Sequence, residues 1–165
     1  MLIRPGGTMI NLSLENILEV MDALKTNELL IGELYKQCSM QWPEDREFWS
    51  STEQEEYTHA EYINDMKELL KSNPAEYTIG RSFNKDAAAT VKKWIEDIIN
   101  KVKKGEISKI KMLYIARDLE QSLLESKFHE LLDSSNIAYN TLANKITSET
   151  RQHLEKIKIK IKEST

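Results

Sequence analysis

The chain has 165 residues, of which 40% are hydrophobic and 30% are charged, and its formal net charge is −4. That length and apolar content predict one domain with a core large enough to fold unaided, while the acidic balance argues against nucleic acid or an anionic membrane surface as partner. The single cysteine, Cys38, excludes an internal disulfide and favours a reducing, cytoplasmic setting, and no apolar run approaches the roughly 20 residues of a membrane span.

The first two predicted elements are long helices. Residues 1–11, which contain Pro5-Gly6-Gly7, are expected to form a flexible leader, and residues 12–165 the domain. Apolar periodicity predicts a first helix from about residue 14 to residue 40. A second follows at residues 43–72, opened by a proline, which is favoured at the first helical position. The short connection predicts that these helices are antiparallel neighbours.

The second part of the chain predicts another helix pair. A crossover at residues 74–107 contains an additional helix near residues 87–103, and two further helices are expected at residues 108–132 and 136–162. The alternating Lys-Ile run near the C-terminus is assigned to the last helix, because its isoleucines continue the apolar stripe. Two antiparallel helix hairpins joined by a long crossover predict an all-α four-helix bundle.

Polar side chains interrupt the apolar stripe of every predicted bundle helix. These positions are Glu28 in the first helix, Glu56 and His59 in the second, Glu120 in the third and His153 in the fourth. Burying an ionised carboxylate costs several kcal/mol unless it is paired, so three of them on core faces indicate a cationic partner. Two divalent cations would supply four positive charges against three negative ones, and mixed carboxylate and imidazole ligands suit iron or manganese.

The order of these residues along the chain resembles that of a known protein family. A lone Glu on one helix and Glu-x-x-His on the next is the arrangement of di-iron and di-manganese carboxylate bundles. With NELLIGELY around Glu28, EEYTHAEYI around Glu56 and ARDLEQSLLESKFHELL around Glu120, the chain resembles the rubrerythrin branch of the ferritin-like family from about residue 12 onward. The resemblance implies a ferritin-like four-helix bundle in which two metal ions, iron foremost with manganese or zinc as alternatives, are held by Glu28, Glu56, His59, Glu120 and His153. It also implies that Tyr35 is a neighbour of the ligands.

One position departs from the family pattern. The family has a Glu three residues before the last histidine, whereas this chain has Thr150 there, in SETRQHLEK. Glu149, four residues before His153, lies on a neighbouring helix face and is a candidate substitute ligand. The second half of the site could therefore hold its metal through an altered ligand, leave the protein with one metal, or hold none.

Two functions remain open from the sequence. By the resemblance, the chain would be a di-iron carboxylate protein that reduces peroxide or oxygen, or that oxidises Fe(II). Because it lacks the rubredoxin-like iron site of longer family members, its electrons would come from a separate donor protein, and a homodimer is one expected assembly. The alternative is a degenerate, metal-poor bundle acting as an interaction or sensor protein, in which Lys127, Arg117 or Arg151 would neutralise Glu120 and Glu56.

Overall fold

A computed structural model describes residues 6–165, and these residues are mainly helical, which confirms the all-α class. The five helices are α1 (Gly6–Gln41), α2 (Arg46–Ser72), α3 (Lys85–Lys103), α4 (Lys109–Ser126) and α5 (Ile137–Ser164). Within the described residues, none of the helices combines the length and the apolar composition that crossing a lipid bilayer requires.

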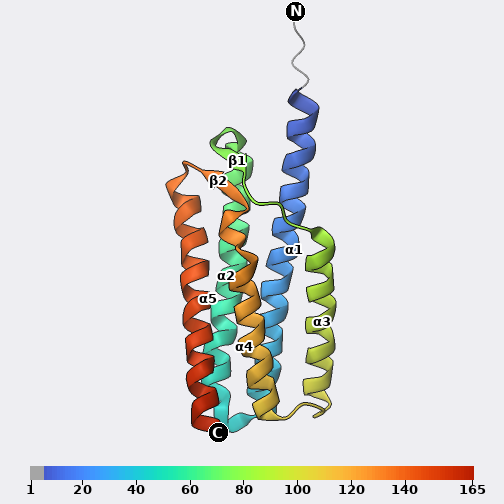
Figure 1. The fold of residues 1–165 in the computed structure, drawn as a ribbon, viewed down its shortest axis with the longest axis vertical. Coiled ribbons are helices and arrows are strands. Elements are labelled where there is room, and N and C mark those ends of the chain that lie inside the picture. The colour runs from blue at the N-terminus through green and yellow to red at the C-terminus, as the bar shows by residue number, and fades with distance from the viewer. Residues whose placement is uncertain (1–5) are drawn as a thin grey trace, which may run out of the picture.

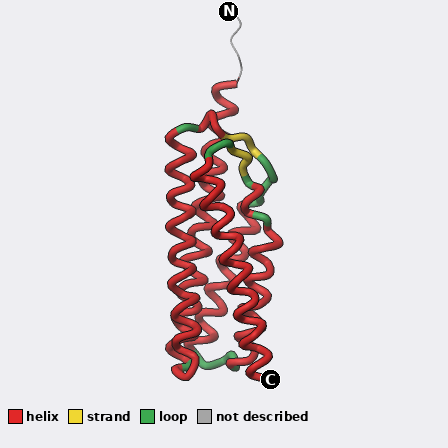
Figure 2. Tube along the Cα trace, turned by 90° about the vertical axis from the view of Figure 1, so that its left-hand side faces the viewer, coloured by secondary structure: helices red, strands yellow, loops and turns green. Residues whose placement is uncertain are grey.

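The helices are arranged as two adjacent hairpins with α3 alongside (Figure 1). Helix α1 packs against α2, which runs in the opposite direction, and α4 packs against α5 in the same way. Contacts between α2 and α5 join the two hairpins, whereas α3 packs on α1. The view from the side in Figure 2 shows the long helices running nearly parallel to one axis, with the loops gathered at the two ends.

Local side-chain hydrogen bonds explain where three of the helices begin. The side chains of Asn84, Ser108 and Asn136 accept hydrogen bonds from backbone N–H groups two or three residues ahead, at the starts of α3, α4 and α5. Such caps satisfy N–H groups that have no partner inside the helix. Pro43 opens the 3-10 turn Pro43–Asp45 that leads into α2.

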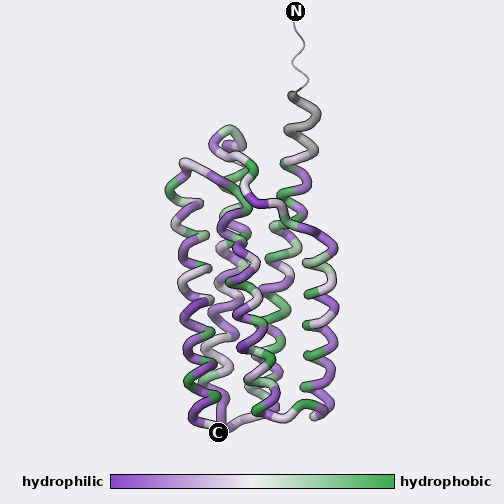
Figure 3. The backbone as a smooth tube through the Cα atoms, in the orientation of Figure 1, coloured by the Kyte–Doolittle hydropathy of each residue, from purple (hydrophilic) through white to green (hydrophobic). Residues whose placement is uncertain are grey.

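The core consists of two apolar clusters stacked along the helices, with a polar layer between them. On α2, Trp49 belongs to one cluster and Ile63 to the other, and on α5 the corresponding residues are Ile157 and Ile146. Figure 3 shows how apolar and polar stretches alternate along each helix. The polar layer therefore lies at mid-height of the bundle, covered by apolar packing on both sides.

Several predicted boundaries differ from the structure. Helix α1 begins at Gly6, so residues 6–11 of the predicted leader are helical, and residues 1–5 lie outside the described part of the chain. The prediction that the third bundle helix reaches residue 132 is wrong. Helix α4 ends at Ser126 because Lys127 adopts a left-handed φ of 53°. The Lys-Ile run near the C-terminus is helical, as predicted.

A two-stranded clasp joins the crossover to the turn after α4. Strand β1 (Tyr77–Ile79) pairs antiparallel with β2 (Leu132–Ser134). Beyond the strands, the Gly80 N–H donates a hydrogen bond of 3.0 Å to the carbonyl of Leu131. A Cβ at Gly80 would collide with the carbonyl oxygen of Glu130, so the close approach of the two segments requires glycine. The clasp fixes the position of the turn that precedes β2.

Candidate metal centre

The structure brings all five predicted ligands together in the polar layer. Their side chains come from four helices, namely Glu28 from α1, Glu56 and His59 from α2, Glu120 from α4 and His153 from α5. All five are buried, and Glu56, His59 and Glu120 have no exposed surface. Helical periodicity places these side chains on the inward faces of their helices. The packing of the helices then brings them to a common depth in the bundle.

Glu56 lies at the centre of the group, and its two oxygens face different histidines. Its Oε2 atom lies 3.4 Å from Nδ1 of His59, and its Oε1 atom lies 2.8 Å from Nδ1 of His153. The two imidazole rings are stacked, with centroids 5.3 Å apart. One atom from each of these three residues lies within 4.8 Å of the others, a spacing that a metal ion can bridge.

The two remaining carboxylates extend this arrangement symmetrically. Glu28 Oε2 lies 3.9 Å from His59 Nδ1, and Glu120 Oε2 lies 3.8 Å from His153 Nδ1. The result is two groups of three donors, each made of one terminal carboxylate, one histidine and one oxygen of Glu56. The Glu56 carboxylate belongs to both groups, as a bridging ligand would.

The inward-facing donor atoms are unpaired. Glu28 Oε2, both oxygens of Glu56, Glu120 Oε2 and Nδ1 of each histidine have no hydrogen-bond partner among the described residues. The 2.8 Å contact between Glu56 and His153 is close enough for an ion pair but is not aligned as a hydrogen bond. Buried polar atoms are rarely left unpaired in proteins, so six of them facing one interior space indicate a ligand that they share.

Lysine and arginine side chains do not neutralise these carboxylates. Within residues 6–165, neither lysine nor arginine forms an ion pair with Glu28, Glu56 or Glu120. Lys127 lies near Glu130 and Arg117 contacts Asp118, at the surface, and Arg151 is exposed. The metal-free neutralisation considered from the sequence therefore does not occur in this structure.

The donor spacing fits transition-metal ions. Oxygen and nitrogen ligands lie about 2.0–2.2 Å from such an ion, so two ligands of one ion lie about 3 Å apart in octahedral geometry and about 3.5 Å apart in tetrahedral geometry. The observed separations of 2.8, 3.4, 3.8 and 3.9 Å cover this range and exceed it by a few tenths of an ångström. The distances from each histidine to its two neighbouring carboxylates are therefore compatible with a shared ion.

The outer nitrogens of the two histidines contact carboxylates in a reciprocal pattern. Glu149, on α5, lies 2.9 Å from Nε2 of His59, on α2. Glu55, on α2, forms an ion pair with Nε2 of His153, on α5, and is also held by Lys156 at 3.1 Å. The structure therefore places Glu149 behind a histidine rather than among the inward-facing donors.

Glu55 is a site residue that the sequence reasoning missed. A signal for it was present, because each histidine is preceded by an acid four residues earlier, Glu55 before His59 and Glu149 before His153. A carboxylate that contacts the outer nitrogen of a histidine fixes the ring orientation and increases its basicity as a ligand. Both acids therefore support the histidine of the opposite helix.

Tyr35 is in contact with one of the predicted ligands. Its hydroxyl donates a buried hydrogen bond of 2.5 Å to Glu120 Oε1, which leaves the other oxygen of Glu120 for the inner space. Burial and the negative charge of Glu120 raise the pKa of Tyr35 well above its usual value. The hydroxyl therefore stays protonated and can hold Glu120 in one orientation.

Burial and charge repulsion strongly affect protonation in this layer. Burial and the charge of Glu56 raise the pKa of Glu28 well above its usual value. Burial and the charge of Glu120 raise the pKa of Glu56 to about 7. Burial alone would lower the pKa of His153, but the nearby carboxylates of Glu120 and Glu56 outweigh it and raise that pKa to about 11. Metal ions would displace these extra protons.

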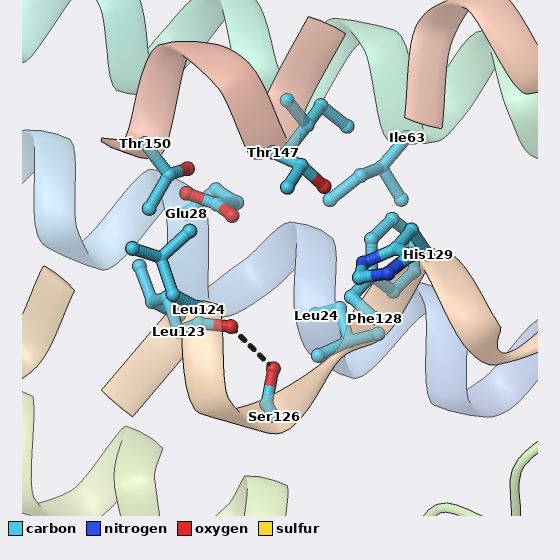
Figure 4. A pocket seen from close by; sticks show the side chains of 11 residues that line it. Leu24, Glu28, Ile63, Leu123, Leu124, Ser126, Phe128, His129, Thr147 and Thr150 are labelled. Carbon is cyan, nitrogen blue, oxygen red and sulfur yellow. Dashed lines mark hydrogen bonds between the residues drawn. The ribbon is translucent and has the colours of Figure 1, made fainter. Parts of the chain in front are cut away.

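Thr150 borders a narrow pocket that reaches the polar layer. Thr150 is buried, with 3% of its surface exposed, and it lines this pocket together with Glu28 (Figure 4). His129 and Phe128, in the turn after α4, line it as well. His129 is exposed, and its place in the pocket lining depends on where the clasp holds this turn.

Comparison of the chain with protein-family models, curated proteins and solved structures finds no match. The resemblance to the rubrerythrin branch therefore rests on the motifs and their spacing.

Proposed function

We propose that this protein is a two-metal carboxylate protein of the rubrerythrin type, with a ferritin-like bundle fold, that binds two iron ions on either side of Glu56. The observation that carries the proposal is the division of the Glu56 oxygens between His59 and His153, each accompanied by one further carboxylate. The unpaired state of these buried donor atoms supports it. Manganese and zinc are the alternative ions for the same donor set.

When bound, two Fe(II) ions would supply the two electrons that reduce one peroxide, with two protons, to two waters. The protein's part is to hold the donors in place and to keep bulk water out. Glu55 and Glu149 orient the two histidines, and Tyr35 fixes Glu120. The apolar clusters above and below the layer exclude solvent, which strengthens every charge interaction inside it.

The electrons would come from a separate protein, since the chain has one cysteine and no cysteine-ligated iron site. In the absence of such a donor, Fe(II) itself would be the substrate, oxidised by peroxide or oxygen. A cytoplasmic location, which the single cysteine favours, belongs to the same proposal.

The rival function is that of a metal-poor bundle that acts through protein contacts, and Thr150 is the observation that favours it. Threonine at this position removes one of the four carboxylates that the family pattern provides. If the loss of this carboxylate leaves too few ligands for the second ion, the centre would bind one metal or none. The bundle would then retain its fold without redox chemistry.

Metal stoichiometry distinguishes these functions. The purified protein, stripped with a chelator, would be titrated anaerobically with Fe(II) and in parallel with Co(II), whose visible absorption reports ligand type and geometry. We expect two ions per chain, imidazole and carboxylate ligation of Co(II), and consumption of one peroxide per two Fe(II). Uptake of one ion per chain or fewer would contradict the proposal and support the metal-poor bundle.

A further inference from the structure

The pocket beside the metal centre has the dimensions and lining of a binding site. Its volume is about 30 Å³, room for about two water molecules. The walls are mainly apolar, and Figure 4 shows the polar groups at the two ends, with Glu28 and Thr150 near one and His129 near the other. Its apolar walls are formed by Leu24, Ile63, Leu123, Leu124 and Ile146.

The position of Thr150 explains why the pocket reaches the donors. Thr150 precedes His153 by three residues, as Glu56 precedes His59, so both side chains point into the polar layer. The threonine side chain ends one bond beyond Cβ, whereas the carboxylate oxygens of glutamate lie three bonds beyond it. A glutamate here would extend its carboxylate into the space that borders Glu28.

Charge gives this space a preference for anions once metals are bound. Three carboxylates and two divalent ions leave a net charge of +1, which one monoanion would cancel. Before metals bind, this net positive charge is absent. The pocket therefore depends on the proposed two-metal centre.

Taking size, lining and charge together, we infer that the pocket binds a small monocarboxylate of the formate or acetate class, whose carboxylate acts in place of the side-chain carboxylate that Thr150 lacks. The narrow volume excludes larger acids, and the apolar walls disfavour strongly hydrated anions such as phosphate. The hydroxyls of Thr147 and Ser126 already donate to the carbonyls of Ala143 and Leu123, which leaves the Thr150 hydroxyl to donate to the carboxylate of the ligand.

The test uses the Co(II)-loaded protein and three variants. Formate and acetate would be titrated while the visible Co(II) spectrum is recorded, with benzoate and phosphate as comparison ligands. We expect saturable spectral changes with formate and acetate, at least about tenfold weaker binding of benzoate and phosphate, and no acetate binding to the metal-free protein by calorimetry.

Thr150→Glu supplies the carboxylate from the chain itself, so the variant should still bind two Co(II) ions but lose its response to acetate. Thr141→Glu makes the same change at an exposed position of α5 and should respond like the unaltered protein. Leu124→Phe, which fills the pocket without adding charge, should keep the metals and weaken acetate binding, and it serves as a second test if Thr150→Glu does not fold.

The outcomes separate the two proposals. Two bound metals with no response to formate or acetate, or an acetate response unchanged in Thr150→Glu, would overturn the pocket assignment and leave the metal centre standing. Equal binding of phosphate would overturn the carboxylate preference. Failure of the unaltered protein to bind metal would overturn the metal centre and, with it, the pocket assignment.

Discussion

The two halves of the polar layer are built on the same plan but differ at one side chain. In the half formed by α1 and α2, Glu28 lies 3.9 Å from His59, and in the half formed by α4 and α5, Glu120 lies 3.8 Å from His153. The first half has Glu56 three residues before its histidine, and the second has Thr150. The helices therefore keep the donor geometry even where one carboxylate is absent, and the Glu56 carboxylate contacts the histidines of both halves.

The halves also differ in how firmly their terminal carboxylates are held. The Tyr35 hydroxyl donates a hydrogen bond to Oε1 of Glu120, whereas Glu28 borders the pocket. The Oε2 atoms of both residues are unpaired. We therefore expect the Glu120 carboxylate to be the more rigid of the two and the Glu28 carboxylate to be the more accessible to a small ligand.

Removal of the shared carboxylate should affect both halves at once. We expect Glu56→Ala to weaken binding of both metal ions by more than the roughly 10- to 100-fold that loss of an outer partner costs, because Glu56 contributes an oxygen to each group of donors. Titration with Co(II) measures the effect, and Glu47→Ala, at an exposed position of α2, is the control. Loss of only one ion would show that the halves are independent.

The outer carboxylates should have unequal effects. Glu55→Gln and Glu149→Gln should each weaken metal binding by roughly 10- to 100-fold, with the larger loss for Glu55, since Lys156 holds Glu55 against His153. Competition with a coloured chelator gives the affinities, and Glu155→Gln, on the exposed face of α5, controls for charge. Equal and small losses would mean that neither acid orients its histidine.

The stability of the metal-free protein should fall as the pH rises. Glu56 binds its proton more tightly in the folded chain, with a pKa of about 7 instead of 4.5, and so does His153, with a pKa of about 11 instead of 6.5. The stabilisation that these protons provide is complete below the unfolded-state pKa of each group and is lost as the pH rises through the folded-state value. The loss is on the order of 1 kcal/mol per pH unit for each group within its window.

Thermal unfolding of chelator-treated protein between about pH 6 and about pH 9 measures this loss, expected as a fall in Tm of roughly 2–4 °C per pH unit. The stabilisation that bound Zn(II) adds should increase over the same range, because the metal competes with these protons. A Tm of the metal-free protein that rises with pH would contradict the protonation described for Glu56 and His153.

The parts of the fold and site that follow helical periodicity were predictable from the sequence. The inward placement of Glu28, Glu56 and Glu120 and the helical Lys-Ile run near the C-terminus are of this kind, because spacing along one helix sets the face on which a side chain lies. The capping residue Ser108 likewise marks the start of α4 locally.

Features that depend on the packing of distant segments were not predictable in this way. The end of α4 at Lys127 carries no glycine or proline signal, and the strands of the clasp have three residues each and pair across more than fifty positions. The contact of Glu55 with His153 can be predicted only if the packing of α2 against α5 is known. The pattern of residues along one helix gives no information on contacts between segments that are far apart in the sequence.

The clasp between β1 and β2 has a consequence for how molecules reach the buried layer. The turn that carries Phe128 and His129, at the outer end of the pocket, leads directly into β2, and β2 is paired with β1 of the crossover. The outer end of the pocket is thus formed by a segment that contributes no donor atom to the candidate metal centre. Substitutions in this turn can therefore change the access of small molecules to the polar layer, whereas substitutions in the helices change the metal-binding residues.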